Sequence, residues 1–552
     1  MGFNLIPIAV GAVVVWLVYH FVAYPIFFSP LAKIPVPHWS CHVSPLWILL
    51  ARKNNFQNRS LHKAHLQYGP VVRIGPNELS VDGYDAIKTV YQGGFEKDQW
   101  YSIFDNYGVP NMFSTLESKA HSLRKRMVSN AYSKSFIQAS PAAKAQARKL
   151  LFGRLLPLLS ESSAGPEPQG IEVFSTFLAS TMDFITAYIF GLRNSTDFLR
   201  DKSYRDHWLQ LYLVRASFGF WPQEMPQLTE FLGRFGPMLK PYPAWVDDAN
   251  AELREWNTKL CEKTYNATHG LEVAEKQDPA DEPVVFQAME AGIEKERRVN
   301  GKESLLYSTA ILKKNLSMAS ELFDQLLAGQ ETAGIALTYL AWHLSKSPDL
   351  QQQLRQELLT LEPPLTMPAD GSLPGNLPDP KSVDALPLLN AMVMETLRLN
   401  APIPGPEPRQ TPQPSCQLGE FHVPGGVRVA ALGYTLHRNE NVFPEPEVWN
   451  HTRWLESETN EEQRREMSRY FWAFGSGGRM CVGSNFAMNG EVKETCCVIT
   501  RLLTCITEMK LIAAAIWSNF TTYIVDDTDI EQDDTYTARP IAERLMLRFE
   551  RV

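Results

Sequence analysis

Glycine residues are concentrated around one cysteine near the C-terminal end of the chain. The stretch FWAFGSGGRMCVGSNFAMN, residues 471–489, places four glycines and one arginine around Cys481. Glycine loses more conformational freedom on folding than any other residue, so this stretch favours close backbone approach over regular structure. Backbone N–H groups directed at the sulfur, and a helix beginning just after Cys481, would stabilise a thiolate. The pattern therefore predicts a loop that holds a thiolate.

A metal ion is the natural partner of such a thiolate. No cysteine or histidine with zinc-type spacing accompanies Cys481, so a four-ligand zinc site is not expected. A haem iron needs only one protein ligand. An ordinary buried cysteine is the commoner fate of this residue type, but it would not need the surrounding glycines. A haem-thiolate site is the interpretation that uses the whole stretch.

A second group of residues, Ala328-Gly329-Gln330-Glu331-Thr332, lies within the predicted helix 317–344. Ala328, Gly329 and Thr332 are three or four positions apart and share one face, where the small residues open a groove. The Thr332 hydroxyl can bond the carbonyl of Ala328 and bend the helix. An acid beside a hydroxyl, here Glu331, is a plausible proton relay. The alternative is a close helix crossing with an ordinary threonine.

Two further motifs carry charge. Glu395 and Arg398 are spaced i,i+3, so they can pair on one helix face, although such pairs are common and usually solvated. Arg453, in the stretch NHTRW, follows a proline-punctuated segment and could join that pair. These residues predict a small ionic network.

In this order the four motifs resemble those of the cytochrome P-450 family, the haem-thiolate monooxygenases, most closely the filamentous-fungal microsomal type. The resemblance spans nearly the whole chain. It rests on the cysteine loop, on the pair Glu395 and Arg398 with Arg453, and on the oxygen-binding helix at Ala328–Thr332. His451 and Thr452 replace the usual proline and acidic residue before Arg453. The cysteine loop matches at Phe474, Gly475, Gly477, Arg479, Cys481 and Gly483.

The resemblance implies haem b with Cys481 as the axial thiolate and metal ligand. The two haem propionates need cations, and the family's positions for these fall on Arg479, Arg409, His121 and Lys125. Lys125 stands where arginine is common, so it supplies charge without a bidentate fork. The remaining residues of the loop would bind the cofactor as well.

The implied activity is monooxygenation: dioxygen and two electrons from an NADPH-cytochrome reductase hydroxylate or epoxidise a lipophilic small molecule, in fungal secondary metabolism. Dioxygen would bind opposite Cys481, in the groove at Ala328 and Gly329, and Thr332 and Glu331 would help to deliver protons. Two alternatives are a reductase-independent haem-thiolate isomerase or dehydratase and a non-enzymatic haem-binding protein. Substrate choice is assigned to the segments 99–113, 211–242 and 403–407 and to the loop before Arg539, with the aromatic stretch 218–226 lining an access channel or packing at a helix end.

The composition of the chain limits which partners, which cellular compartment and which kind of membrane attachment we expect. The 552 residues carry a net charge of −8, which argues against nucleic-acid binding. Seven irregularly spaced cysteines suit a reducing compartment. Residues 5–23 are apolar and uncharged, and about 20 such residues cross a bilayer. With lysine and arginine only after this segment, we expect a single-pass anchor in the endoplasmic reticulum with the catalytic domain in the cytosol, rather than a cleaved signal peptide.

The elements that must position these residues are mostly helical. Helical patterns cover 115–160, 170–215, 245–270, 305–360 and 382–400. A hairpin is expected at 71–81, short strands at 421–432 and 545–549, and a loop at 362–380. The predicted fold is mainly α with small β-sheets. We expect an anchor at 1–27, a proline-rich hinge at 28–40 and a single catalytic domain at 41–552.

One segment does not fit the resembling family. Residues 490–507, GEVKETCCVITRLLTCIT, separate the cysteine loop from the EMK phrase that begins at Glu508. Without these 18 residues, Glu508 would follow Cys481 by nine positions, as the family pattern expects. The segment is rich in cysteine and β-branched residues, which are poor helix formers. We interpret it as an insertion or a retained intron; a genuine longer helix is the alternative.

Overall fold

The computed structural model describes residues 5–163, 170–270, 278–482 and 504–552. Most of this chain is helical, and three small sheets lie at its periphery, as the sequence predicts. Gly483 and most of the 490–507 segment lie outside the described residues, as does the helix expected directly after Cys481.

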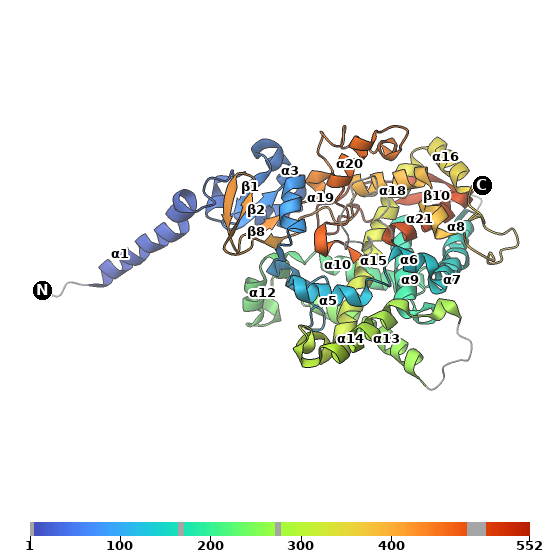
Figure 1. Cartoon of the computed structure of the whole chain (residues 1–552), viewed down its shortest axis with the longest axis horizontal. Helices are drawn as coiled ribbons and strands as arrows, with labels where there is room; N and C mark the ends of the chain where they lie inside the picture. The colour runs from blue at the N-terminus through green and yellow to red at the C-terminus, as the bar shows by residue number, and fades with distance from the viewer. Residues whose placement is uncertain (1–4, 164–169, 271–277, 483–503) are drawn as a thin grey trace.

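The N-terminal segment projects away from the rest of the molecule (Figure 1). It comprises α1 (Leu5–Val18) and the π-helical turn η1 (Tyr19–Phe28). Ala9–Phe28 is long and apolar enough to cross a membrane and is not buried against the protein. A second helix of similar character, α9 (Val173–Phe190), is mostly buried and belongs to the core. The N-terminal span is therefore the candidate membrane anchor.

A five-stranded sheet follows the anchor. Its order is β1 (Val71–Gly75), β2 (Glu78–Val81), β8 (Arg428–Ala430), β5 (Arg409–Gln410) and β3 (Glu96–Lys97). The antiparallel pairing of β1 with β2 confirms the predicted hairpin. β5 brings the second half of the chain against β3 of the first half, with Lys97 opposite Arg409. This pairing positions two cations that are more than 300 residues apart in sequence.

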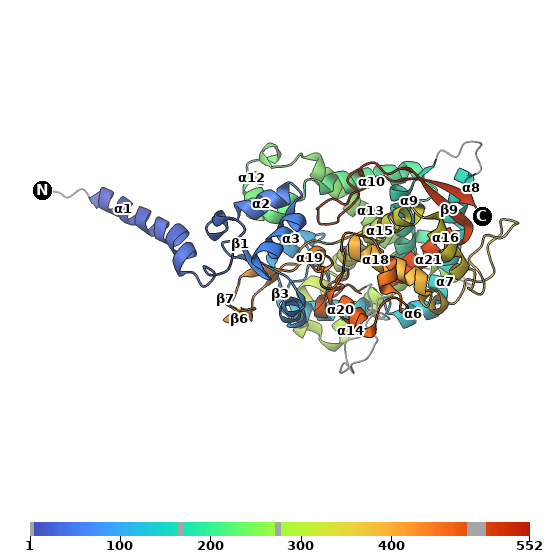
Figure 2. The ribbon, with the colours of Figure 1, turned by 90° about the horizontal axis from the view of Figure 1, so that it is seen from above.

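Helix α15 (Lys314–Ser345) runs through the helical body and packs along α9. Its buried length explains why the sequence there is apolar on most sides. Figure 2 shows α15 surrounded by neighbouring helices, with the chain termini at opposite ends of the molecule. The other α-helices are α2 (Leu46–Lys53), α3 (Gln57–Tyr68), α4 (Tyr84–Ile87), α5 (Ser118–Val128), α6 (Lys134–Ala139), α7 (Pro141–Leu150), α8 (Leu156–Ser163), α10 (Lys202–Ala216), α11 (Phe220–Glu224), α12 (Pro226–Gly233), α13 (Trp245–His269), α14 (Val284–Val299), α16 (Pro348–Leu358), α17 (Pro380–Asp384), α18 (Pro387–Leu399), α19 (Gly433–Leu436), α20 (Glu461–Tyr470) and α21 (Thr504–Asn519).

Two smaller sheets complete the fold. One contains β4 (Ile171–Glu172), β10 (Met546–Arg551) and β9 (Phe520–Asp526), and the other pairs β6 (Ser415–Leu418) with β7 (Phe421–Pro424). The expected strand at 545–549 is confirmed by β10, whereas β9 was missed. Between α16 and α17, residues 362–379 form no helix or strand, which confirms the predicted loop. The single helix predicted at 382–400 is wrong in one respect: Pro387 starts a second helix, because proline suits a first helical turn.

Candidate active site

The cysteine loop is a tight turn closed by backbone hydrogen bonds. Gly475 N–H donates to Trp472 O at 3.1 Å, Met480 N–H to Gly477 O at 3.1 Å and Cys481 N–H to Phe474 O at 3.0 Å. Gly475 and Gly477 both have φ near +70°, a conformation that strains other residues. A Cβ at Gly477 would lie 2.2 Å from the carbonyl oxygen of Tyr91. These two glycines are therefore required by the turn, which leaves Cys481 exposed at its end.

The loop is anchored to the body of the protein on both sides of its turn. Phe474 is half-buried and packs against the main hydrophobic core. Lys125, on α5, donates through Nζ to the carbonyl oxygens of Met480 at 2.8 Å and Gly478 at 3.2 Å. Helix α5 thus holds the backbone immediately before Cys481.

Arg479 points from the loop toward the start of α5. Its guanidinium donates to the carbonyl oxygens of Thr115, at 2.6 Å, and Leu116, and it pairs with Glu96 at 3.0 Å. Burial lowers the pKa of Arg479 to about 10, against the opposing effect of Glu96. Glu96 itself has 53% of its side chain exposed, so it neutralises this arginine weakly.

Arg409 is almost fully buried on β5. Its guanidinium donates to the Tyr101 hydroxyl at 3.0 Å and pairs with Glu407 at 3.2 Å. It also lies over the rings of Tyr91 and Tyr101, at 4.8 and 5.7 Å. An arginine held this firmly presents its charge from a fixed position.

His121 shows how closely the cations gather. Burial, followed by the charges of Arg479, Lys97, Lys125 and Arg409 in that order, lowers its pKa to about 2. Lys125 has a pKa lowered to about 8, also chiefly by burial. The structure therefore brings together all four residues that were expected to face the propionates. Three of them are cations, and they surround the neutral imidazole of the fourth, His121.

Lys97 is a member of this group that sequence reasoning missed. Burial lowers its pKa well below the usual range, as do Arg409 and Arg479. Its ammonium donates to Phe113 O and lies 4.0 and 4.1 Å from the ring centroids of Tyr101 and Phe113. No local signal marks Lys97, because the pairing of β3 with β5 brings it to the site.

We call Lys97, Lys125, Arg409 and Arg479 the cationic cluster. Its carboxylate partners among the described residues are Glu407 and the exposed Glu96. Buried cations without full compensation are costly, so the cluster is suited to an anionic ligand. Haem carries two carboxylates, and its iron takes one axial ligand, as the exposed Cys481 would provide. The residues present therefore fit a haem-thiolate site.

Helix α15 presents one open stripe in an otherwise buried stretch. Between Ser317 and Ala341 nearly every residue is buried, but Ala328 is exposed and Thr332 is half-buried. The Thr332 hydroxyl donates to Ala328 O at 2.7 Å, as expected. The two residues are therefore accessible on this face of α15.

Gly329 is half-buried, as Thr332 is, and it also lies beside a close helix crossing. A Cβ at Gly329 would lie 2.9 Å from Ile185 Cγ1 of α9. The groove expected at Ala328 and Gly329 stays a prediction, and the crossing with α9 is a second reason for a glycine at this position.

The expected contact between Glu331 and Thr332 is also absent, since their hydrogen bonds go elsewhere. The Glu331 carboxylate is 2% exposed and accepts from the Tyr212 hydroxyl at 2.6 Å and from Thr537 Oγ1 at 2.9 Å. It also pairs with Arg539 at 2.5 Å. Consecutive helix residues point about 100° apart, so Glu331 faces α10 and the C-terminal loop rather than the open stripe. It can reach the stripe only after leaving Arg539.

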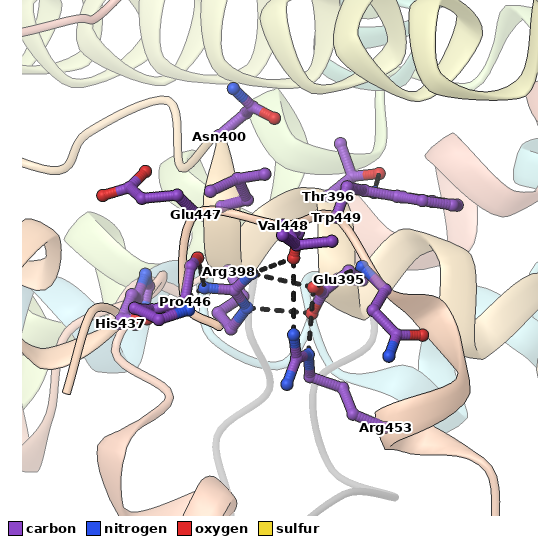
Figure 3. Close-up of polar contacts among 12 residues, drawn as sticks. Glu395, Thr396, Arg398, Asn400, His437, Pro446, Glu447, Val448, Trp449 and Arg453 are labelled. Atoms are coloured by element: carbon purple, nitrogen blue, oxygen red, sulfur yellow. Dashed lines mark hydrogen bonds and ion pairs between the residues drawn. The ribbon is translucent and has the colours of Figure 1, made fainter. Parts of the chain in front are cut away.

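The ionic network predicted from Glu395, Arg398 and Arg453 is present and buried (Figure 3). Arg398 binds Glu395 with two hydrogen bonds, Nε to Oε2 at 2.9 Å and Nη2 to Oε1 at 2.8 Å. Arg453 Nε adds a third, to Oε1 at 3.1 Å. Arg398 also donates to the carbonyl oxygens of His437 and Pro446. The network ties α18 to the irregular segment that leads into the cysteine loop.

Comparison with known proteins agrees with this geometry. Residues 37–498 match the family model described as Cytochrome P-450. The chain is 26% identical over 459 residues to a cytochrome P-450 monooxygenase (avaI) of Aspergillus versicolor, covering 80% of this chain and 96% of that one. It is 25% identical to stcB of Emericella nidulans, covering 83% and 79%, and 26% identical to FGM1 of Gibberella zeae, covering 98% and 96%. Both are also named cytochrome P-450 monooxygenases.

The chain therefore belongs to the cytochrome P-450 family and is a haem-thiolate enzyme of the monooxygenase type. Membership implies haem with a cysteine thiolate, a redox partner, dioxygen and an organic substrate. The N-terminal apolar helix is compatible with the membrane anchor of the microsomal type.

Proposed function

We propose that this protein is a microsomal monooxygenase that hydroxylates or epoxidises a lipophilic small molecule, in fungal secondary metabolism, with electrons from an NADPH-cytochrome reductase. The observation that carries the proposal is that the cationic cluster gathers around His121, while Lys125 binds the backbone immediately before Cys481. The fungal relatives support the reaction type. We further propose a single-pass anchor at residues 1–27 in the endoplasmic reticulum, a hinge at 28–40 and a cytosolic catalytic domain at 41–552.

Haem b, ligated by Cys481, would supply the chemistry of oxygen activation. The protein's own residues would hold it and control protons. Lys97, Lys125, Arg409 and Arg479 would bind the propionates, and Gly475 and Gly477 would allow the tight turn that presents Cys481. Phe474 would pack the loop against the core.

Protons would reach the open stripe of α15 through Thr332. Its hydroxyl donates its one proton to Ala328 O at 2.7 Å, so it would pass that proton to a ligand only after rotating away from this carbonyl. Glu331 would recharge this hydroxyl only after its carboxylate turns from Arg539 toward the stripe. The hydrogen bonds from Tyr212, Thr537 and Arg539 would thus keep the Glu331 carboxylate away from Thr332 until the carboxylate changes its orientation.

We also propose that residues 490–507 are an insertion or a retained intron. The family match ends at residue 498, within this segment, although α21, which begins at Thr504 near its end, and the strands β9 and β10 come after that point. Helix α21 is well packed, with Ile512 and Trp517 fully buried, so the chain after the segment supports the fold.

The test is the reduced carbon-monoxide difference spectrum of the full chain, of Cys481→Ala and of a chain lacking residues 490–507. A thiolate-type Soret band that Cys481→Ala abolishes, and that Cys416→Ala leaves unchanged, would support the haem-thiolate assignment. A stronger band in the shortened chain would support the insertion. Equal bands in both lengths would show that the segment is tolerated, and no band in either would overturn the assignment.

A further inference from the structure

Glu407 is an acid beside the cationic cluster that has no role in the proposed reaction. The sequence places it at the end of segment 403–407, which is assigned to substrate choice, but its side chain turns to Arg409, where Oε2 accepts from Nη2 at 3.2 Å. Its backbone is also held: its N–H donates to Ala431 O at 3.2 Å, and its carbonyl oxygen accepts from the Tyr91 hydroxyl at 2.8 Å. The carboxylate therefore meets Arg409 from a fixed backbone.

The cysteine loop passes directly beside this carboxylate. A Cβ at Gly475 would lie 3.0 Å from Glu407 Oε1 and 3.4 Å from Oε2. Interiors are close-packed, so a side chain at position 475 would crowd the carboxylate against Arg409. The glycine thus leaves the space that the Glu407 side chain needs, besides allowing the turn of the loop.

Arg409 keeps donors that its present contacts do not use. Nη1 donates to the Tyr101 hydroxyl at 3.0 Å and to Pro408 O at 3.1 Å, and Nη2 donates to Glu407. Among the residues that the structure describes, none accepts a hydrogen bond from Nε, and Nη2 has this one partner. A guanidinium can bind a carboxylate with two parallel hydrogen bonds. Donors therefore remain for a haem propionate while Glu407 stays in place.

The orientation of those donors depends on what holds the guanidinium. The rings of Tyr91 and Tyr101 lie 4.8 and 5.7 Å from its central carbon and limit how far the group can tilt. Glu407 is the one carboxylate that pairs with Arg409 in the described part of the chain. Hydrogen bonds to a charged acceptor are about twice as strong as neutral ones, so Glu407 is the strongest restraint on rotation.

We propose that Glu407 is a positioning residue that orients Arg409 toward one haem propionate. This inference rests on the proposed haem-thiolate function. Glu407 holds Nη2 from one side, and the remaining donors on Nε and Nη2 bind the propionate. The position therefore requires a hydrogen-bond acceptor, and an uncharged acceptor of the same length is sufficient.

The test measures haem loss from the full, haem-loaded chain, with an excess of apomyoglobin to capture the released haem. We expect Glu407→Ala to release haem about tenfold faster than wild type, the effect of one lost hydrogen bond to a charged group. Glu407→Gln, whose amide oxygen still accepts from Arg409, should stay within about twofold. Glu420→Ala, at an exposed position, is the control and should keep the wild-type rate.

A double-mutant cycle shows whether Glu407 acts through Arg409. In an Arg409→Ala background, Glu407→Ala should change the rate by less than about twofold, because the residue that it orients is gone. Glu407→Leu fills the space without an acceptor and should lose haem as Glu407→Ala does, which separates the hydrogen bond from a packing defect.

Wild-type rates in Glu407→Ala and Glu407→Leu would overturn the inference. Equally fast loss from the Ala and Gln variants, or a full tenfold effect in the Arg409→Ala background, would overturn it as well. A wild-type chain without a thiolate-type carbon-monoxide band would refute the proposed function, and the inference would fail with it. A normal band with equal rates in all variants would refute the inference alone.

Discussion

Arg453 reaches Glu395 across 58 positions of sequence and donates a hydrogen bond of 3.1 Å to a carboxylate that Arg398 already holds with two. Glu395 and Arg398 have no exposed side-chain surface, and Arg453 is 8% exposed. Two buried arginines therefore share one buried acid, and both also donate to backbone carbonyls. The network is stable only with all its members.

Glu395→Gln should be strongly destabilising, because it leaves Arg398 and Arg453 buried without a counterion. Breaking a buried ion pair by removing one partner typically costs about 3–5 kcal/mol. Urea unfolding of the purified chain measures the loss. Glu466→Gln, in the exposed pair with Arg469, is the control and should change the unfolding free energy by less than about 1 kcal/mol. Similar values for the two variants would contradict a structural role for Glu395.

Two adjacent glycines in the cysteine loop should respond differently to alanine. Gly477 has φ near +70° and no space for a Cβ beside Tyr91 O, whereas Gly478 has nothing within 4 Å. We expect Gly477→Ala to lose haem or to cost more than about 2 kcal/mol, since strained backbone and steric overlap add. Gly478→Ala should bind haem normally. Haem content per chain and thermal unfolding compare the pair, and equal haem content in both would refute the proposed tight turn.

Acid should destabilise the fold through His437. Burial, followed by the charges of Arg398 and Arg438, lowers its pKa to about 3, and its Nε2 accepts the N–H of Trp472 at 2.8 Å. The unfolded chain binds a proton near pH 6.5 and the folded chain does not until about pH 3. The contribution of His437 to folding is therefore lost as the pH falls, by ~2 kcal/mol between pH 6.5 and 4.5.

His437→Gln keeps a hydrogen-bond acceptor but cannot titrate, so its unfolding free energy should fall less steeply across that pH range. Urea unfolding at several pH values gives the slope. His422→Gln, at an exposed position on β7, should keep the wild-type slope. An unchanged slope in His437→Gln would mean that the imidazole becomes protonated in the folded chain.

Glu224 connects the segment around α11 to the N-terminal sheet. Its carboxylate binds Arg52 Nη1 at 2.8 Å and Trp100 Nε1 at 2.7 Å, and Arg428 Nη1 lies 3.7 Å away. Glu224→Gln removes the charge and leaves Arg52 and Arg428 with Glu78 alone. We expect faster amide hydrogen exchange in residues 218–240, because local opening no longer breaks a buried ion pair. Glu230→Gln, in an exposed pair, should leave exchange unchanged; equal exchange in both variants would show that Glu224 does not restrain this segment.

Local signals in the sequence determined the cysteine loop and its required glycines, the i,i+3 pair of Glu395 and Arg398, the apolar N-terminal span and the helical character of the body. These depend on residue type and short spacing, which act before the chain is packed. The i,i+3 spacing did not reveal that the pair is fully buried, since exposed pairs have the same spacing.

Only the tertiary structure decided which residues that are far apart in sequence lie close enough to interact through their charges. The pairing of β3 with β5 brings Lys97 opposite Arg409, the crossing with α9 leaves no space for a Cβ at Gly329, and Arg539 in the C-terminal loop binds the Glu331 carboxylate. Each outcome depends on which neighbour excludes water at that point, because burial and charge act through space rather than along the chain. The sequence by itself determined that a thiolate could be held at Cys481, and only packing decided which cations gather around His121 next to that loop and which residues bind the Glu331 carboxylate.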